Sequence, residues 1–527
     1  MKKTIFFVIL TAVLALSSCS KLLDVQRKAV VNFDTYYTTD EDAEAAVAAM
    51  YLDVRDWYYN VMLVKNMLTD DHFAGGAAHG DNVDMDALGE FAFNSETSQI
   101  ESSFKGYYTL IYHANVILDH INPANSEVMA RAVAEAHLFR GWAYFELATL
   151  WGNPPLVDHE LDASEYQMGN SDTNVLWQFI VDEYTAAINS GMLAKKSSLN
   201  DTATWRVTEH YAYALRGKAY LWMATVLNDD KYYQMAADEF KLVVESQLYD
   251  LFTAGPYGDM RHIQYKMNCE NLFESIRVND PARQCNFADI MDNFDFYGAM
   301  VGWRSSGSEM TIPGDVSATG GWGFMVPTED LLNAFNTYEG VDSYRRTETI
   351  KTYNELKAMG VTWNKETLSS GLFTWKGRFM SDEVSTYSMV NFKNPLWMRF
   401  AEVLLLGAEA NLKAGHDDVA LQYVNRVRTR AQLPALGAVT MDQIKTEKRL
   451  ELVGEGTRFQ DLVRWGDAYD LLKDKGGVYP KMQTNGTVSY EPTGRSVHGF
   501  QKGKHERLPY PFTETQLNKV IEQNDGY

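Results

Sequence analysis

A short helical segment that occurs twice constrains the fold of this chain more than any other feature. Residues 140–145 (RGWAYF) are echoed by residues 216–221 (RGKAYL), and a looser relative spans residues 402–415. Small residues at helical spacing let two helices approach closely, and the run from Tyr220 to Phe240 fits the tetratricopeptide pattern of paired helices. Alanine-rich helices can also resemble one another by chance. We favour degenerate helical repeats, which predict a mainly α fold.

Long helices are predicted along most of the chain. Apolar residues recur at helical spacing from a polar cap near residues 39–41 onwards. The further expected helices span residues 104–121, 127–150, 175–188, 207–227, 232–244, 328–335, 395–433 and 440–465. Thr440 and Gln443 have the spacing of a capping box, and Thr513 with Gln516 repeats this spacing at the last helix.

Two stretches break the helical pattern. Residues 70–103 carry scattered glycines among Asp and Asn residues, which predicts a long irregular loop. Residues 251–394 combine short apolar runs, glycine clusters and scattered aromatic side chains, with short strands expected around residues 372–379. Irregular segments of this length in a compact protein are often functional. The sequence therefore predicts a helical scaffold that carries a loop-rich, aromatic insertion with few short strands.

The N-terminus has the form of a secretory leader. Two lysines precede an apolar run that is too short to span a bilayer comfortably, and small residues then lead to Cys19. The ending LSSC resembles the lipobox of bacterial lipoproteins, whose cysteine carries the lipid of the mature chain. The alternative is an ordinary signal peptide with an accidental cysteine. We expect residues 1–18 to be removed and Cys19 to be lipidated.

Charge and cysteine content narrow the class of protein. The 70 acidic residues outnumber the 48 basic ones and give a formal net charge of -22. Nucleic acids and anionic lipid surfaces favour clustered Lys and Arg, so we expect no nucleic-acid partner. The two remaining cysteines, Cys269 and Cys285, either form one disulfide or stay as two buried thiols. No Cys/His spacing indicates structural zinc, and we expect neither metal nor cofactor.

Five motifs follow the lipobox in a recognisable order. They are residues 140–155 (RGWAYFELATLWGNPP), 327–335, 399–415 (RFAEVLLLGAEANLKAG), 444–466 and the ending 511–527. Together they resemble the SusD-like (SusD/RagB) family, the surface lipoproteins of Bacteroidetes that capture nutrients for a TonB-dependent outer-membrane transporter. One departure is Lys448-Arg449, where relatives often carry a run of arginines. The resemblance extends over nearly the whole mature chain.

The resemblance implies a SusD-like fold and a non-catalytic role in uptake. The expected divisions are residues 1–18 as signal peptide, 19–39 as lipidated tether, 40–250 as helical repeats, 251–394 as the loop-rich ligand-binding part, 395–433 as completion of the repeats and 434–527 as the C-terminal region. A member of this family would be lipid-anchored at the outer membrane, bind glycan and deliver it to a SusC-like TonB-dependent transporter. A peptide-binding uptake lipoprotein of the same family is the alternative, and a glycoside hydrolase is a further one.

Several charged residues of these motifs are predicted to be structural. One set has helical spacings of three and four, so its members can pair along one helix face. This set comprises Glu451, Glu455, Arg458 and Asp461. We interpret it as a network that fixes the last helix to the scaffold, not as a catalytic set. Arg140 and Arg399 are expected to cap or bridge neighbouring helices.

A glycan site needs an exposed aromatic plane with polar groups beside it, because sugars present an apolar CH face and a rim of hydroxyls. Two loop stretches meet this requirement. The candidate ligand-binding residues are Phe296, Tyr297, Trp303, Arg304 and Trp322 in one stretch, and Asp71, His72, Asp81 and Asn82, near His79, in the other. Trp303, Trp322 and Tyr297 are the preferred anchors. The alternative is that these aromatic side chains fix loops to the core.

The sequence has no recognisable catalytic motif. It lacks His-Glu-x-x-His, Gly-x-Ser-x-Gly and a phosphate-binding glycine loop. Paired carboxylates for glycoside hydrolysis are defined by a separation in space, which the sequence does not give. An acidic stretch from Asp81 fails as a calcium loop, because Asp86 and Ala92 stand where Gly and Glu are required. We therefore expect a binding protein, with a pure protein-interaction scaffold as the alternative to a glycan binder.

Overall fold

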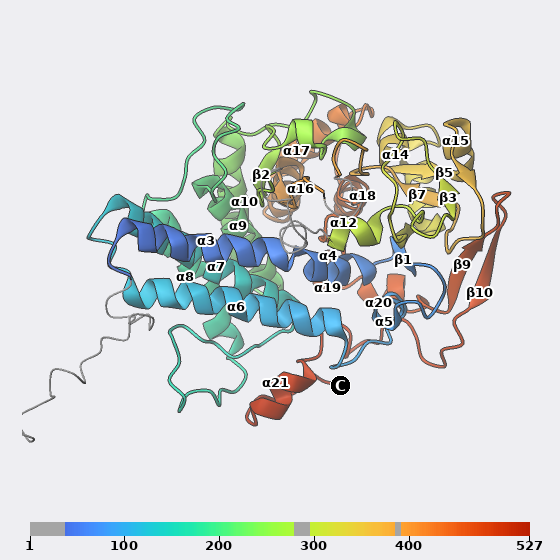
Figure 1. The fold of residues 1–527 in the computed structure, drawn as a ribbon. Coiled ribbons are helices and arrows are strands. Elements are labelled where there is room, and N and C mark those ends of the chain that lie inside the picture. Colours follow the sequence, from blue (N-terminus) through green and yellow to red (C-terminus); the bar gives the residue numbers. More distant parts are fainter. Residues whose placement is uncertain (1–36, 279–295, 385–390) are drawn as a thin grey trace, which may run out of the picture.

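The computed structural model describes residues 37–278, 296–384 and 391–527. The leader, Cys19 and the tether up to residue 36 lie outside these residues, as does Cys285. The described chain is mainly helical, with stacked helices on one side and short two-stranded sheets on the other (Figure 1). This confirms the predicted mainly α architecture. Within the described residues, no helix is both long and apolar enough to cross a membrane.

Antiparallel helix pairs form the scaffold. Its helices are α3 (Asp40–Asp56), α4 (Tyr58–Met67), α6 (Ser98–His120), α7 (Glu127–Leu150), α8 (Thr173–Asn189), α9 (Glu209–Val226), α10 (Lys231–Glu245), α16 (Phe400–Lys413) and α17 (Asp417–Arg430). From α6 to α10 each helix packs against the next, and α16 continues the stack on α10 (Figure 1). The loop-rich part therefore leaves and re-enters a continuous stack of helices.

The repeated segment at residues 140–145 and 216–221 corresponds to a repeated ion pair between successive helices. Arg140 in α7 forms a bidentate pair with Glu183 in α8, at 2.7 and 2.8 Å. Arg216 in α9 pairs with Glu239 in α10 through a single bond from Nη2 to Oε1, at 2.8 Å. The predicted bridging role of Arg140 is confirmed.

The glycine after each of these arginines allows the helices to approach closely. A Cβ atom on Gly141 would lie 3.0 Å from the ring of Tyr184, and one on Gly217 would lie 3.0 Å from the ring of Phe240. Larger residues at these two positions would push the helices apart. The repeat is thus a packing unit of arginine and glycine on one helix and of glutamate and an aromatic ring on the next.

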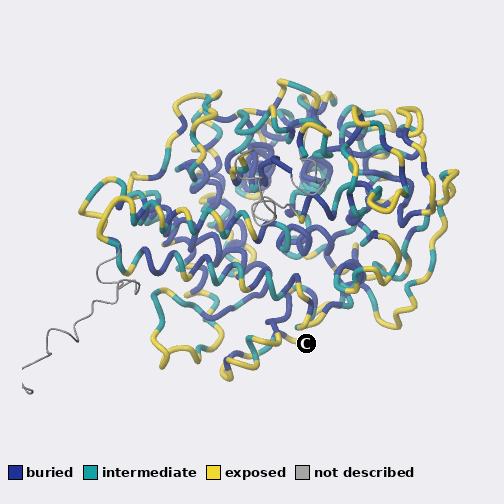
Figure 2. The backbone as a smooth tube through the Cα atoms, viewed as in Figure 1, coloured by how far each residue is buried: buried dark blue, intermediate teal, exposed yellow. Residues whose placement is uncertain are grey.

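The hydrophobic core runs through the middle of the stack. Residues 138–150 of α7 and residues 400–411 of α16 are buried without interruption, so both helices are covered on all sides. Exposed residues are concentrated in the loops and on the outer helix faces (Figure 2). This rigid core is the platform from which the loop-rich part projects.

Outside the helical stack, the described residues form short helices and five two-stranded antiparallel sheets. The helical segments are α5 (Val83–Glu90), η1 (Tyr257–Asp259), η2 (Ile263–Tyr265), α12 (Phe296–Val301), α13 (Glu329–Glu339), α14 (Tyr344–Thr349) and α15 (Tyr353–Ala358). The strand pairs are β1 (His72–Gly75) with β4 (Phe324–Pro327), β2 (Asn271–Glu274) with β8 (Leu396–Arg399), β3 (Met310–Thr311) with β6 (Thr362–Trp363), β5 (Ile350–Thr352) with β7 (Leu372–Thr374), and β9 (Val478–Met482) with β10 (Val488–Pro492).

Two sequence predictions need correction here. Residues 70–103 are not one irregular loop, because they hold β1, α5 and the start of α6. The stretch from residue 395 begins as a strand, β8, and becomes helical only at Phe400. The strands β1 and β8 form by pairing with strands that are distant in the chain. Local sequence patterns do not predict such long-range pairing.

The C-terminal region contains α18 (Met441–Glu451), α19 (Arg458–Trp465), α20 (Ala468–Leu472) and α21 (Phe512–Leu517). The capping box of Thr440 with Gln443 is confirmed. The predicted single helix to residue 465 is wrong, because the chain turns between α18 and α19 through Gly454 and Gly456, which both have positive φ. Thr513 does not cap the last helix, whose N-cap is Pro511.

A buried ion network joins these parts. Arg399, fully buried at the end of β8, pairs with Glu270, Glu451 and Glu455. The predicted structural role of the set of Glu451, Glu455, Arg458 and Asp461 is confirmed, although only Asp461 pairs within its own helix, with Arg464, and the others pair with distant elements. Cys269 is half-buried and has no disulfide partner among the described residues, and Cys285 lies outside them.

Candidate functional site

The pairing of β1 with β4 brings the two candidate stretches together. Gly75 lies opposite Phe324, and the amide of Gly76 donates to the carbonyl of Gly323 at 3.0 Å. A Cβ atom on Gly75 would lie 2.2 Å from that carbonyl oxygen, and its φ is 82°, so the close approach requires glycine. The loop after β1 and the segment before β4 are thereby fixed side by side.

Trp322 and Arg304 lie on the β4 side of this junction. Trp322 is half-buried, with part of its ring packed against the main core. Arg304 donates from Nη1 to the carbonyl of Trp322 at 3.2 Å, and its Nε lies 3.3 Å from Glu309. The guanidinium is therefore held next to the backbone of Trp322. An aromatic ring with such donors beside it matches the apolar face and the hydroxyl rim of a sugar.

Asp81 and Asn82 lie on the other side, in the loop between β1 and α5. Asp81 is exposed and its Oδ2 accepts from the amide of Ala77 at 3.0 Å. Asn82 is the N-cap of α5, and its Oδ1 accepts from the amide of Met85 at 3.1 Å. These bonds fix the direction of both polar side chains in a loop that faces solvent.

Trp303 and Tyr297 are buried, so the prediction that they form an exposed platform is wrong. Trp303 is 6% exposed, packs edge-to-face on Phe373 and donates from Nε1 to the carbonyl of Thr374 at 3.0 Å. Tyr297 is 7% exposed and packs edge-to-face on Tyr58. The stated alternative applies to both rings, because they fix the glycine-rich segment to the interior.

Phe296, next to Tyr297 at the start of α12, is 39% exposed. Its ring lies 5.4 Å from that of Tyr59 in α4, centroid to centroid. It belongs to the α4–α12 contact and not to the junction of β1 with β4.

Asp71 and His72 are also buried, and neither is an exposed group of a surface site; Asp71 holds β1 in place, and His72 lines an internal cavity. Asp71 pairs with Arg449 of α18 at 2.8 Å, and its neighbour Asp70 pairs with Arg458 of α19 at 2.8 Å. Burial, reinforced by the charge of Lys475, lowers the pKa of His72 to about 3, so the imidazole is neutral. The acidic turn at this point is therefore an anchor for β1 on the C-terminal helices.

The sequence analysis missed the hairpin β9–β10, which supplies two aromatic side chains to this region. Tyr490 is 39% exposed, and its ring lies 6.1 Å from that of Phe73 in β1. Tyr479 stacks on the imidazole of His79, with 4.6 Å between ring centroids. The available signal was Asn485-Gly486 between two runs of strand-forming residues, which is typical of a hairpin turn.

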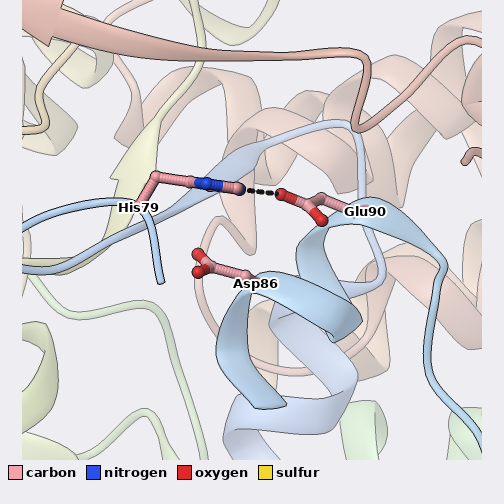
Figure 3. A group of neighbouring side chains, drawn as sticks. All are labelled: His79, Asp86 and Glu90. Carbon is pink, nitrogen blue, oxygen red and sulfur yellow. Dashed lines mark hydrogen bonds and ion pairs between the residues drawn. The ribbon is translucent and has the colours of Figure 1, made fainter. Parts of the chain in front are cut away.

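His79, Asp86 and Glu90 form a compact group at the base of the same loop (Figure 3). His79 Nε2 lies 2.7 Å from Glu90 Oε1, and Asp86 Oδ2 accepts from the amide of Gly80 at 2.7 Å. Arg495 pairs with the other oxygen of Glu90. One imidazole and two carboxylates could hold a divalent transition metal. Their hydrogen bonds in this structure tie the loop to α5 and to the segment after the hairpin, which makes the loop rigid.

Residues from three segments thus meet around β1, and we call them the β1 loop cluster. The cluster comprises Phe73, His79, Asp81, Asn82, Arg304, Trp322, Tyr479 and Tyr490. It combines aromatic rings with carboxylate, amide and guanidinium groups on loops held by a rigid scaffold. Such an arrangement is suited to binding a polar ligand with apolar faces, and it contains no activated nucleophile next to a base.

Two family models match complementary parts of the chain. A model described as "Starch-binding associating with outer membrane" matches residues 23–221, and a model described as "SusD family" matches residues 346–527. Neither description names a catalytic activity. Together they cover the helical scaffold and the C-terminal region.

Similar proteins extend over nearly the whole chain. A SusD-like protein of Bacteroides ovatus is 24% identical, over 99% of this chain and 97% of that protein. The structure of a laminarin binding SusD-like protein is 26% identical with a TM-score of 0.76, over 92% of this chain and 99% of that one. Surface glycan-binding protein A from Bacteroides thetaiotaomicron in complex with laminarihexaose is 23% identical with a TM-score of 0.69, over 92% of this chain and 100% of that one.

Proposed function

This chain belongs to the SusD family, and on that premise we propose that it is a cell-surface glycan-binding protein that captures oligosaccharide or polysaccharide for import. The observation that carries the proposal is the β1 loop cluster, where Trp322 and Arg304 lie beside the polar loop of Asp81 and Asn82. Sugar rings stack on aromatic planes while amides, carboxylates and guanidinium groups bond their hydroxyls. The chain acts as a binder and not as a catalyst.

Preorganisation supports binding at this cluster. The loop after β1 is tied through Gly76 to Gly323 and through Gly80 to Asp86, and His79 is stacked on Tyr479. A loop that is already ordered loses little conformational freedom when a ligand binds, so more of the contact energy contributes to affinity.

We further propose that Cys19 carries a lipid that anchors the protein in the outer membrane, and that the bound glycan passes to a SusC-like TonB-dependent transporter. The leader with its LSSC ending and the family membership support both statements. Labelling with a fatty-acid analogue tests the anchor, because Cys19→Ala should abolish incorporation of the label. Co-purification of a transporter of this class from membranes tests the partner.

Affinity gel electrophoresis with polysaccharides tests the glycan-binding role. We expect at least one neutral or acidic polysaccharide in the gel to retard the purified protein, with no release of oligosaccharide. A peptide mixture is the matched comparison, because peptide uptake is the alternative within the family. Binding to peptides with no retardation by any polysaccharide would contradict the glycan assignment and leave the uptake role standing.

A further inference from the structure

A cavity bordered by His72 of β1 and Met325 of β4 is lined by basic side chains. It measures about 70 Å³ and is enclosed mainly by residues of α12, by the strand β7 with the segment that follows it, and by residues 393–395. Four of its lining residues are cationic, namely Arg261, Lys376, Arg378 and Lys393. Among the described residues that line it, none is Asp or Glu. In a chain with a net charge of -22, such a lining needs a specific explanation.

Three of these cations are neutralised by carboxylates behind the cavity wall. Lys376 pairs with Glu455 at 2.7 Å. Arg378 pairs with Asp259 at 2.8 Å, and Lys393 lies 3.5 Å from Glu383. Their ammonium and guanidinium hydrogens are also bonded to backbone carbonyls. The charges of Lys376, Arg378 and Lys393 are therefore already compensated by the protein, and these side chains serve as structural walls of the cavity.

Arg261 differs from the other three. Its Nη2 donates to the hydroxyl of Tyr58 at 3.2 Å, and no acidic residue of the described chain lies within ion-pair distance of it. Its Nε is buried without any hydrogen-bond partner. A buried guanidinium normally has a carboxylate partner, because an unpaired charge away from water is costly. Arg261 thus brings to the cavity a guanidinium that has no carboxylate within ion-pair distance among the described residues and whose Nε has no hydrogen-bond partner.

A second unpartnered group faces the same space. The Nδ1 atom of His72 is buried and has no hydrogen-bond partner, and His72 lines the cavity. Gly377 lies against the guanidinium, since a Cβ atom there would be 3.6 Å from Nη1 of Arg261. The backbone therefore leaves room beside the charged group where a side chain would have filled it.

From these observations we propose that the Arg261 cavity binds an anionic substituent, a carboxylate or a sulfate ester, of an acidic glycan. One water needs about 10–15 Å³ of such space, so a cavity of about 70 Å³ holds a charged group but is far below the 300 Å³ or more of a site for a whole small ligand. The sugar ring that bears the group would stay outside, towards the half-exposed side chains of Val301 and Phe379. A guanidinium binds such planar or tetrahedral anions through two parallel hydrogen bonds.

This inference rests on the proposed function and narrows it to acidic glycans. The variant Arg261→Met tests it, because methionine keeps the apolar stem and removes the charge. Arg261 is half-buried and has no ion-pair partner among the described residues, so its charge stabilises the fold little and the variant should fold and unfold at the same or a higher temperature. Arg55→Met in α3 removes a charge elsewhere and is the matched control.

Calorimetric titrations should compare three probes: an oligouronide, its carboxyl-reduced neutral counterpart and a sulfated oligosaccharide. We expect wild type and Arg55→Met to bind the uronide or the sulfated sugar about tenfold or more tightly than the neutral one, and Arg261→Met to lose that preference. The two acidic probes distinguish the carboxylate from the sulfate ester.

The outcomes separate the two proposals. Equal affinity of wild type for acidic and neutral sugars, or unchanged preference in Arg261→Met, overturns the acidic-glycan inference and leaves glycan binding intact. If no sugar polymer binds, free D-glucuronate and inorganic sulfate serve as probes in thermal unfolding. Stabilisation of wild type but not of Arg261→Met then supports the anion site while the proposed function fails, and equal stabilisation overturns the anion site as well.

Discussion

Arg399 Nε lies 2.7 Å from Glu455 Oε2, and this pair joins the strand β8 to the turn between α18 and α19. The same guanidinium also pairs with Glu270 and Glu451. Glu455 forms a further ion pair with Lys376 of the loop-rich part. One buried cluster therefore connects the helical stack, the loop-rich part and the C-terminal region. The β1 loop cluster depends on these ion pairs, because they fix the position of the loop-rich part on the helical stack.

Removing the central cation should destabilise the protein severely. Arg399→Met removes the one cation that Glu270, Glu451 and Glu455 share, and breaking a buried pair in this way costs about 3–5 kcal/mol. Urea denaturation measures the loss. The control is Lys241→Met, since Lys241 and Glu245 form an exposed pair at 3.7 Å that is worth about 0.5 kcal/mol or less. Similar losses for both variants would contradict the structural role of the network.

The free energy of unfolding should fall at acid pH, because Glu455 of the same buried ion cluster becomes protonated. Burial alone would raise the pKa of Glu455, but the charges of Arg399 and Lys376 outweigh it and lower the pKa to about 2, from an ordinary 4.5. A carboxyl with a depressed pKa stabilises the fold above its unfolded pKa, and this contribution is lost as the pH falls from about 4.5 towards 2.

The matched variant for this pH dependence is Glu455→Gln. The lowered pKa of Glu455 predicts that the free energy of unfolding of wild type exceeds that of the variant by about 3 kcal/mol at pH 7. This difference should decrease steadily between pH 5 and pH 3. Urea titrations at several pH values measure it. A gap that stays constant over this range would show that the charge of Glu455 is not what stabilises the fold.

The repeated glycines should not tolerate a methyl group. Gly141→Ala places a Cβ atom 3.0 Å from the ring of Tyr184, and overpacking of this kind costs about 1–3 kcal/mol. In α5, a Cβ atom on Gly89 would have its nearest neighbours at 3.4 Å, so Gly89→Ala should be neutral or stabilise by up to about 1 kcal/mol. Thermal unfolding of both variants compares them. Equal stability of the two would contradict the close helix approach.

Trp303 should behave as a core residue. Trp303→Ala removes a ring that is 6% exposed and leaves the carbonyl of Thr374 without its donor, at a cost of about 3–5 kcal/mol. Tyr112→Ala, on the outer face of α6, should change stability by less than about 0.5 kcal/mol. Circular dichroism during thermal unfolding measures both. A stable Trp303→Ala variant would mean that the indole is not part of the core.

Local signals were sufficient for the scaffold. The helices at residues 127–150 and 232–244 follow from apolar periodicity, and Thr39 and Thr440 were recognisable as caps. The strands were not predictable, because β1 exists only through its pairing with β4, more than two hundred residues away in the chain. The turn after α18 was missed because the helical charge pattern continues across Gly454 and Gly456.

The site was predictable only in part. The sequence predicted that two separate stretches, one with Arg304 and Trp322 and one with Asp81, contribute to a ligand site, and the β1–β4 pair brings the backbones of these stretches together. It could not tell an exposed aromatic ring from a buried one. Trp303 and Trp322 have similar glycine-rich surroundings, yet only Trp322 remains half-exposed. Trp303 is buried because it packs on Phe373 and Trp375, which lie far away in the chain, and a local pattern does not show such a tertiary contact.

Isothermal titration calorimetry with the polysaccharide that retards the protein most strongly tests the central claim of glycan binding at the β1 loop cluster. Wild type and Tyr112→Ala should bind with the same affinity, and Trp322→Ala, still folded at the titration temperature, should bind about tenfold or more weakly, because one stacked aromatic ring is lost. Unchanged affinity in a folded Trp322→Ala variant would contradict the account.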